Sequence, residues 1–196
     1  MNLLITRIGV LAVATGLFFA PGPAMAGSAT EQLRFTIRKF VNILTNTPVS
    51  ELRVSGLPEA ARKLVFERFD FAEMTRLSLG DHWMSLETSE QREFVAALTH
   101  RMLATYGRAV RSGGEEVRFK REVMVGQRAR VETEVDGDGE LLKIHYQLHD
   151  IEGQWKVYDV VIGDVSVVRN FRAQFDRVIA KSSVKELLQR IKQEDS

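Results

Sequence analysis

The 196-residue sequence contains no cysteine and only four prolines, and its charges nearly cancel. Without cysteine there is no disulfide, no thiol nucleophile and no cysteine to carry the lipid anchor of a bacterial lipoprotein. The 27 basic and 26 acidic residues give a net charge of +1. A general nucleic-acid binder usually has a strong basic excess, and electrostatic adhesion to an anionic membrane also needs one. The charge balance therefore argues against both functions.

The sequence also lacks the common motifs of catalysis and metal binding. There is no glycine-rich phosphate loop, no H-E-x-x-H helix and no G-x-S-x-G serine frame. His145 and His149 could lie on the same side of a strand, but a zinc site normally needs a third protein ligand. Asp136 and Asp138 resemble the start of a calcium loop whose later bidentate acid is missing. We therefore expect no metal, no cofactor and no enzymatic activity.

The one strongly apolar segment lies at the N-terminus. Arg7 precedes an apolar run over residues 8–20, and Ala24-Met25-Ala26 forms an A-x-A cleavage site. The run is shorter than the ~20 residues that a membrane-spanning helix needs. We therefore predict a cleaved secretory signal over residues 1–26. Residues 27–196 then form a single domain of ordinary size.

Helical spacing of apolar residues dominates the first half of the mature chain. Thr88 and Gln91 are spaced as a capping box, with Thr88 as the N-cap of a long helix. Asp70 fits the N-cap of a shorter helix that Gly80 is suited to end. The predicted helices cover residues 30–45, 58–66, about 71–79 and 88–111.

The pattern changes to a period of two after residue 114, which predicts strands over 117–125, 129–135, 140–150 and 155–162. Short turns between them indicate an antiparallel meander. On the last strand Trp155, Val157, Asp159 and Val161 would share one face. Helices are expected to follow over 167–179 and around 184–191. The predicted fold class is α+β, with helices covering a curved antiparallel sheet of about four strands and an apolar cleft between the layers.

Two blocks of the sequence resemble a known family. WKVYDVVIGDVSVVRNFRAQF (155–175) is similar to the C-terminal signature of the MlaC family, which comprises periplasmic phospholipid-binding proteins also called toluene-tolerance auxiliary proteins. FDFAEMTRLSLGDHW (69–83) is similar to the central helical segment of that family. Phe171 departs from the pattern, because the family often has tyrosine there.

The resemblance implies a soluble periplasmic carrier with phospholipid as its cargo. Such a carrier is an auxiliary component of an ABC transporter and maintains the lipid asymmetry of the outer membrane. Its implied partners are an outer-membrane lipoprotein complex and an inner-membrane transporter complex, which it contacts transiently. Acyl chains would occupy the cleft. As its lining we predict the apolar residues on inward faces: Phe71, Met74, Leu77, Trp83, Phe94, Leu98, Met102, Ile144, Tyr146, Leu148, Trp155, Val157, Phe171 and Phe175.

Two other functions remain open from the sequence. A helix-covered curved sheet also describes small cone-shaped enzymes that act on apolar substrates, and Asp159 is then the candidate acid or base. The cleft could instead hold a partner peptide. Arg172 is a candidate partner for a buried carboxylate in any of these cases.

Overall fold

The computed structural model describes residues 28–48, 50–52, 57–106, 117–137 and 140–194. The predicted signal segment and the predicted end of the long helix near Arg111 lie outside these residues. The helices are α1 (Ala29–Thr45), α3 (Glu59–Arg68), α4 (Phe71–Leu79), η1 (Gly80–Ser85), α5 (Thr88–Tyr106), α6 (Val167–Ile179) and α7 (Val184–Glu194). The strands are β1 (Val117–Val125), β2 (Arg128–Gly137), β3 (Glu140–Ile151), β4 (Gln154–Ile162) and β5 (Val165–Ser166).

The strands form one antiparallel sheet in the order β1-β2-β3-β4-β5. This confirms the predicted α+β class and the meander. The two-residue strand β5 was not predicted. Gly163, with φ +60°, allows a tight hairpin in which Val161 pairs with Ser166. The chain therefore folds back along β4 before it enters α6, instead of passing directly into the helix.

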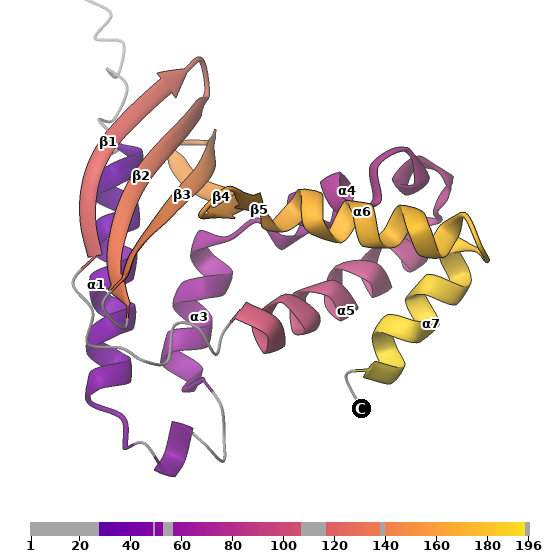
Figure 1. Ribbon diagram of the computed structural model, residues 1–196, viewed down its shortest axis with the longest axis horizontal. Helices are drawn as coiled ribbons and strands as arrows, with labels where there is room; N and C mark the ends of the chain where they lie inside the picture. The colour runs from indigo at the N-terminus through magenta and orange to yellow at the C-terminus, as the bar shows by residue number, and fades with distance from the viewer. Residues whose placement is uncertain (1–27, 49, 53–56, 107–116, 138–139, 195–196) are drawn as a thin grey trace, which may run out of the picture.

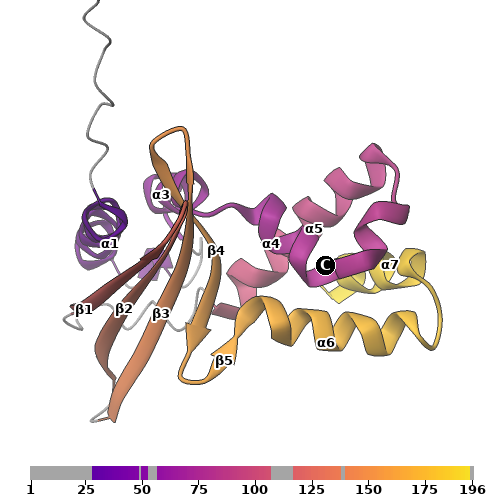
Figure 2. The same cartoon turned by 90° about the horizontal axis from the view of Figure 1, so that it is seen from above.

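Two groups of elements are visible in Figure 1. The sheet and α1 make up one group, and α4, α5, α6 and α7 make up the other. Helix α3 lies between them, and Figure 2 shows α6 leading away from β5 into the helical group. We call the sheet face that packs against α1 the inner face, and the opposite face the outer face. No helix in the described part of the chain is long and apolar enough to cross a membrane.

A β-bulge in β4 changes which residues face inward. Leu148 pairs with Val157, but the next residue back along β3, Gln147, pairs with Asp159, so Tyr158 is the extra residue. Beyond the bulge the alternation is shifted by one, and Val160 and Ile162 join the inner face. The predicted face was therefore right for Trp155 and Val157. It was wrong for Asp159 and Val161, which lie on the outer face.

Two hydrophobic clusters stabilise the two groups. The sheet cluster joins α1 to the inner face and contains Ala29, Leu33, Ala129, Val131, Leu148, Trp155 and Val157. The helical cluster contains Phe71, Met74, Leu79, Phe94, Leu98, Met102, Val167, Val168, Phe171, Phe175, Leu187, Leu188 and Ile191. Phe69 and Val160 pack against both clusters. These two residues therefore mark the boundary between the two cores.

The helix ends follow local hydrogen-bonding rules. Asp70 caps α4 as predicted, and Gly80 ends it with φ +56°. The predicted capping box at Thr88 was wrong, because the backbone N–H of Glu87 donates to the Glu90 carboxylate at 2.9 Å. Glutamate at the third helical position reaches back to the residue before the helix, so Glu87 is the N-cap and Thr88 the first helical residue.

Candidate functional site

Half-buried apolar residues lie where the two cores meet. On the inner face Tyr146 pairs with Val160 and Ile144 pairs with Ile162, and all four keep intermediate exposure. Phe69, also half-buried, pairs with Val157 at the open edge of β4, and its ring stacks on Phe71 at 5.8 Å. We call Phe69, Ile144, Tyr146, Val160 and Ile162 the seam. Apolar surface that the protein itself leaves partly uncovered is the surface that an acyl chain could cover.

Tyr146 is the polar residue of the seam. Burial raises the pKa of its phenol to about 12, so the hydroxyl stays protonated at neutral pH. Within the described residues, no hydrogen bond to this hydroxyl is present, and the side chain keeps intermediate exposure. The side chain packs against the sheet cluster, and part of its surface stays accessible. Its hydroxyl is then free to donate to a polar atom of a bound molecule.

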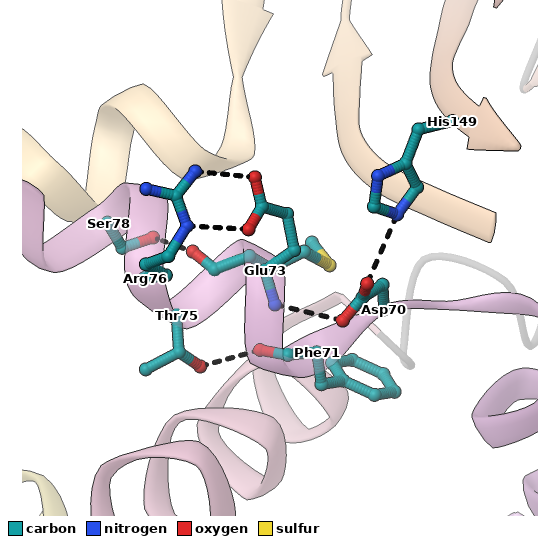
Figure 3. A network of polar contacts seen from close by, with 8 residues as sticks. Asp70, Phe71, Glu73, Thr75, Arg76, Ser78 and His149 are labelled. Carbon is teal, nitrogen blue, oxygen red and sulfur yellow. Dashed lines mark hydrogen bonds and ion pairs between the residues drawn. The ribbon is translucent and has the colours of Figure 1, made fainter. Parts of the chain in front are cut away.

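A polar network fixes α4 to the sheet beside the seam (Figure 3). The backbone N–H of Asp70 donates to the carbonyl of Val157 at 2.8 Å. One oxygen of the Asp70 carboxylate accepts from the backbone N–H of Glu73 at 2.9 Å, and the other lies 3.1 Å from Nε2 of His149 on β3. Asp70 thus caps the helix and reaches the outer face of the sheet at the same time.

The next turn of α4 carries a bidentate ion pair. Arg76 donates to Glu73 from Nε at 2.6 Å and from Nη2 at 2.7 Å. The hydrogen bond from Arg76 holds the pKa of the Glu73 carboxyl below its usual value, against the opposing effect of burial. Positive charge on His149 and Arg128 acts in the same direction. The same hydrogen bond raises the pKa of Arg76. The ion pair lies within α4 and stabilises this turn of the helix.

Asp159, the candidate acid or base of the enzyme hypothesis, instead binds the N-terminus of α6, whose N-cap is Ser166. One carboxylate oxygen accepts from the hydroxyl of Ser166 at 2.6 Å, and the other accepts from the backbone N–H of Val168 at 3.1 Å. Because it lies on the outer face, it does not point toward the seam. Arg172, the candidate partner of a buried carboxylate, forms no ion pair among the described residues.

Two open grooves lie away from the seam. The first, of about 680 Å³, lies between α1, α3 and the start of β4 and includes Arg68. Arg68 donates to Thr36 and Gln32 at 3.0 Å and to the carbonyl of Trp155, and burial lowers its pKa. Two acids, Glu31 and Glu67, line the groove beside Arg68 and Lys156, so its charges balance. The second groove, of about 400 Å³, lies on the outer face.

The structure distributes thirteen of the fourteen predicted lining residues between the two cores, and Ile144 packs against neither cluster. Phe94 and Leu98 in the helical group, and Leu148 and Val157 in the sheet group, have no exposed surface at all. A charge at Leu98 would therefore be placed in a filled core, and we expect Leu98→Glu to unfold the chain instead of only emptying a cleft. Leu77, Trp83, Ile144 and Tyr146 keep intermediate exposure. The lining of a lipid site remains a prediction for the whole set.

Sequence reasoning missed three seam residues, namely Phe69, Val160 and Ile162. Phe69 stood in a block that we had singled out, and its position before the helix N-cap Asp70 was the available signal. Val160 and Ile162 lie on the same strand as Trp155, where an unbroken alternation points them outward. Only the bulge at Tyr158 brings them inward, and no residue type in the strand marks it.

The histidines form no metal centre in the part of the chain that the structure describes. His149 pairs with Asp70, and its ring contacts that of Tyr158 edge-on at 5.3 Å. Nowhere in the described ranges do three histidine, aspartate or glutamate side chains gather as ligands.

Comparison with known proteins shows which proteins the chain resembles. No curated protein sequence matches the chain. A solved phospholipid-binding protein from Ralstonia solanacearum, in complex with a phospholipid, is similar with a TM-score of 0.77 and 18% sequence identity, over 86% of this chain and 97% of that one. At this identity the likeness shows a shared fold. The family model of the MlaC protein matches residues 36–193, most of the sequence, so the chain belongs to the MlaC family.

Proposed function

We propose that the protein binds phospholipid and carries it as a soluble periplasmic shuttle. Membership of the MlaC family supports this, and so does the solved protein of the same fold that is described as phospholipid-binding. The observation in this chain that favours it most is the seam. Its residues are half-buried and, apart from the Tyr146 hydroxyl, apolar, and all except Ile144 pack against one or both cores. Acyl chains would complete the packing there.

The energetics suit a carrier that must both load and release. Each buried methylene gains about 0.8 kcal/mol relative to water, so two acyl chains of about 30 methylenes in total gain on the order of 20 kcal/mol. The same chains are already buried in a bilayer. Transfer from membrane to protein is therefore close to neutral when the protein offers an equally dry site. A half-buried apolar seam with one hydroxyl, that of Tyr146, meets this requirement.

The proposed pathway runs between two membranes. The carrier would exchange lipid with an outer-membrane lipoprotein complex and an inner-membrane transporter complex, and would thereby maintain the lipid asymmetry of the outer membrane. The predicted signal segment over residues 1–26 supports export to the periplasm. Because the sequence has no phosphate loop, the free energy for directional transport would come from a partner or from a lipid gradient.

Native mass spectrometry of the mature chain, followed by solvent extraction, tests the proposal. We expect a mass excess that corresponds to one intact phospholipid per chain, and the extract identifies its head group. A bare polypeptide mass, even after incubation with phospholipid vesicles, would contradict the carrier function. Cell fractionation with an antibody to the mature chain separately tests the periplasmic location.

A further inference from the structure

The groove on the outer face combines charge with apolar walls. It is lined by residues of β3, β4, α4 and α6 and encloses about 400 Å³. Its apolar wall is made by Leu77, Val161 and Val168, and Gln147 and Tyr158 add an amide and a hydroxyl. Asp159, Arg169 and Arg172 supply its charged groups. None of the seam residues contributes to it. We call this the outer groove.

The charges of the outer groove do not cancel. Arg169 and Arg172 lie one turn apart on α6, both are exposed, and neither forms an ion pair among the described residues. The only acid of the groove is Asp159, and both of its oxygens already accept hydrogen bonds, from Ser166 and Val168. The groove therefore keeps a positive excess and two guanidinium groups that are free to bind an anion.

The position of Arg172 depends on a glycine. A Cβ atom built on Gly80 would lie 2.6 Å from Cζ and Nη2 of Arg172, which is closer than atoms approach without a shift. The guanidinium thus rests directly against the backbone where α4 ends. This contact restricts the side chain before any ligand arrives, so less conformational entropy is lost when it binds.

We infer that the outer groove is a docking site for an acidic segment of a protein partner, with a carboxylate between the two arginines and an apolar side chain against Leu77 and Val168. The inference rests on the proposed carrier function, because a shuttle must be recognised by the proteins that load and unload it. A single carboxylate matches the net charge of the groove, and the apolar wall matches a neighbouring leucine or valine.

The geometry favours a protein carboxylate over the phosphate of a carried lipid. Acyl chains in the seam would lie on the inner face of the sheet, whereas Arg169 and Arg172 lie at the outer face. The seam and the outer groove thus lie on opposite faces of β4, so the arginines face away from the side on which the acyl chains would lie.

Nuclear magnetic resonance of the ¹⁵N-labelled mature chain tests the inference. The probe is a five-residue peptide of alternating leucine and glutamate, and its matched control has glutamine in place of each glutamate. Inorganic phosphate and glycerophosphoethanolamine are titrated separately. We expect the glutamate peptide to shift the amide signals of Gln147, Tyr158 and Arg172. In a variant with both Arg169→Gln and Arg172→Gln, we expect its Kd to rise by about tenfold or more.

Arg177→Gln is the matched control variant, since Arg177 is an exposed arginine of α6 outside the groove. It should leave the Kd within about twofold, because the groove keeps both guanidinium groups. The inference is overturned if the glutamine peptide binds equally well, if the glutamate peptide causes no shifts in the groove at millimolar concentration, or if glycerophosphoethanolamine or phosphate binds there more tightly. Lipid content is measured on the same variants by native mass spectrometry. A lipid-free wild type contradicts the carrier function, whereas the peptide titration tests the groove alone.

Discussion

The carboxylate of Asp70 lies 3.1 Å from Nε2 of His149 while its other oxygen caps α4 through the backbone N–H of Glu73. One side chain therefore connects the helical group to the third strand of the sheet. The backbone N–H of Asp70 also donates to the carbonyl of Val157 on β4. Phe69 of the seam pairs with the same residue of β4. Asp70 thereby fixes the position of one wall of the seam.

The first prediction separates the two roles of Asp70. Asp70→Ala removes the cap and the contact with His149, and we expect it to lower the free energy of unfolding by about 1–3 kcal/mol. Asp70→Asn keeps a capping oxygen and should cost less. His149→Gln removes only the partner across the sheet and should cost at most about 1 kcal/mol. Urea unfolding at neutral pH measures all three, and equal losses in Asp70→Ala and Asp70→Asn would show that the cap contributes nothing.

The second prediction concerns acid stability. The Glu73 carboxyl has a pKa below its usual value of 4.5 in the folded chain, chiefly because Arg76 donates to it. Its contribution to stability is therefore complete above pH 4.5 and is lost as the pH falls through the lowered folded pKa. Arg76→Gln should lower stability at pH 7 by up to about 1 kcal/mol, and this difference from wild type should shrink on acidification.

Urea midpoints between pH 7 and pH 3 measure this effect. The matched control is Arg62→Gln, because Arg62 and Glu59 have the same spacing in α3 but lie 3.9 Å apart, and Glu59 is far more exposed than Glu73. It should change stability little at any of these pH values. A difference between Arg76→Gln and wild type that stays constant down to pH 3 would contradict the assigned role of Glu73.

The sequence predicted helix ends, which depend on residues close together in the chain, more accurately than it predicted the pairing of strands. Asp70 as a cap and Gly80 as a helix end follow from local backbone chemistry, and both are present. The predicted N-cap, Thr88, is one residue away from the observed one, Glu87. Glutamates occur at both 87 and 90, and the side chain of Glu90 accepts from the backbone N–H of Glu87. Local rules identify such an end but do not choose between adjacent alternatives.

The bulge at Tyr158 shows what the sequence could not reveal about the site. The segment from Trp155 to Ile162 has one charged residue in each set of alternate positions, Lys156 and Asp159, so either set could face inward. The choice is made by the partner strand, where Gln147 pairs with Asp159. Asp159 therefore lies on the outer face and not on the predicted inner face, and Val160 and Ile162 lie in the seam. Long-range pairing decides this, and a single sequence carries no direct record of it.

The third prediction tests the environment of Tyr146. Because burial raises the pKa of its phenol to about 12, the folded state favours the neutral form. The unfolded chain has an ordinary pKa of about 10. Stability linked to this group is therefore complete below pH 10 and is lost as the pH rises toward 12. In an ultraviolet titration, Tyr146→Phe should remove the phenol that ionises last, and a wild type without such a late step would contradict the buried position.

The last prediction uses the bulge to design a matched pair of variants. Ile162 lies on the inner face in the seam, and Val161 lies beside it on the outer face, with similar intermediate exposure. A carboxylate at 162 would face the acyl chains and cost about 2–3 kcal/mol or more on lipid binding, which corresponds to a loss of affinity of about thirtyfold or more. Native mass spectrometry should therefore find little lipid in Ile162→Glu and normal lipid in Val161→Glu, with both variants folded by circular dichroism. Equal lipid content in the two would place the acyl chains away from the seam. The reverse result, with lipid lost only in Val161→Glu, would move the lipid site to the outer face and would exclude the separation of lipid and partner sites on which the outer groove depends.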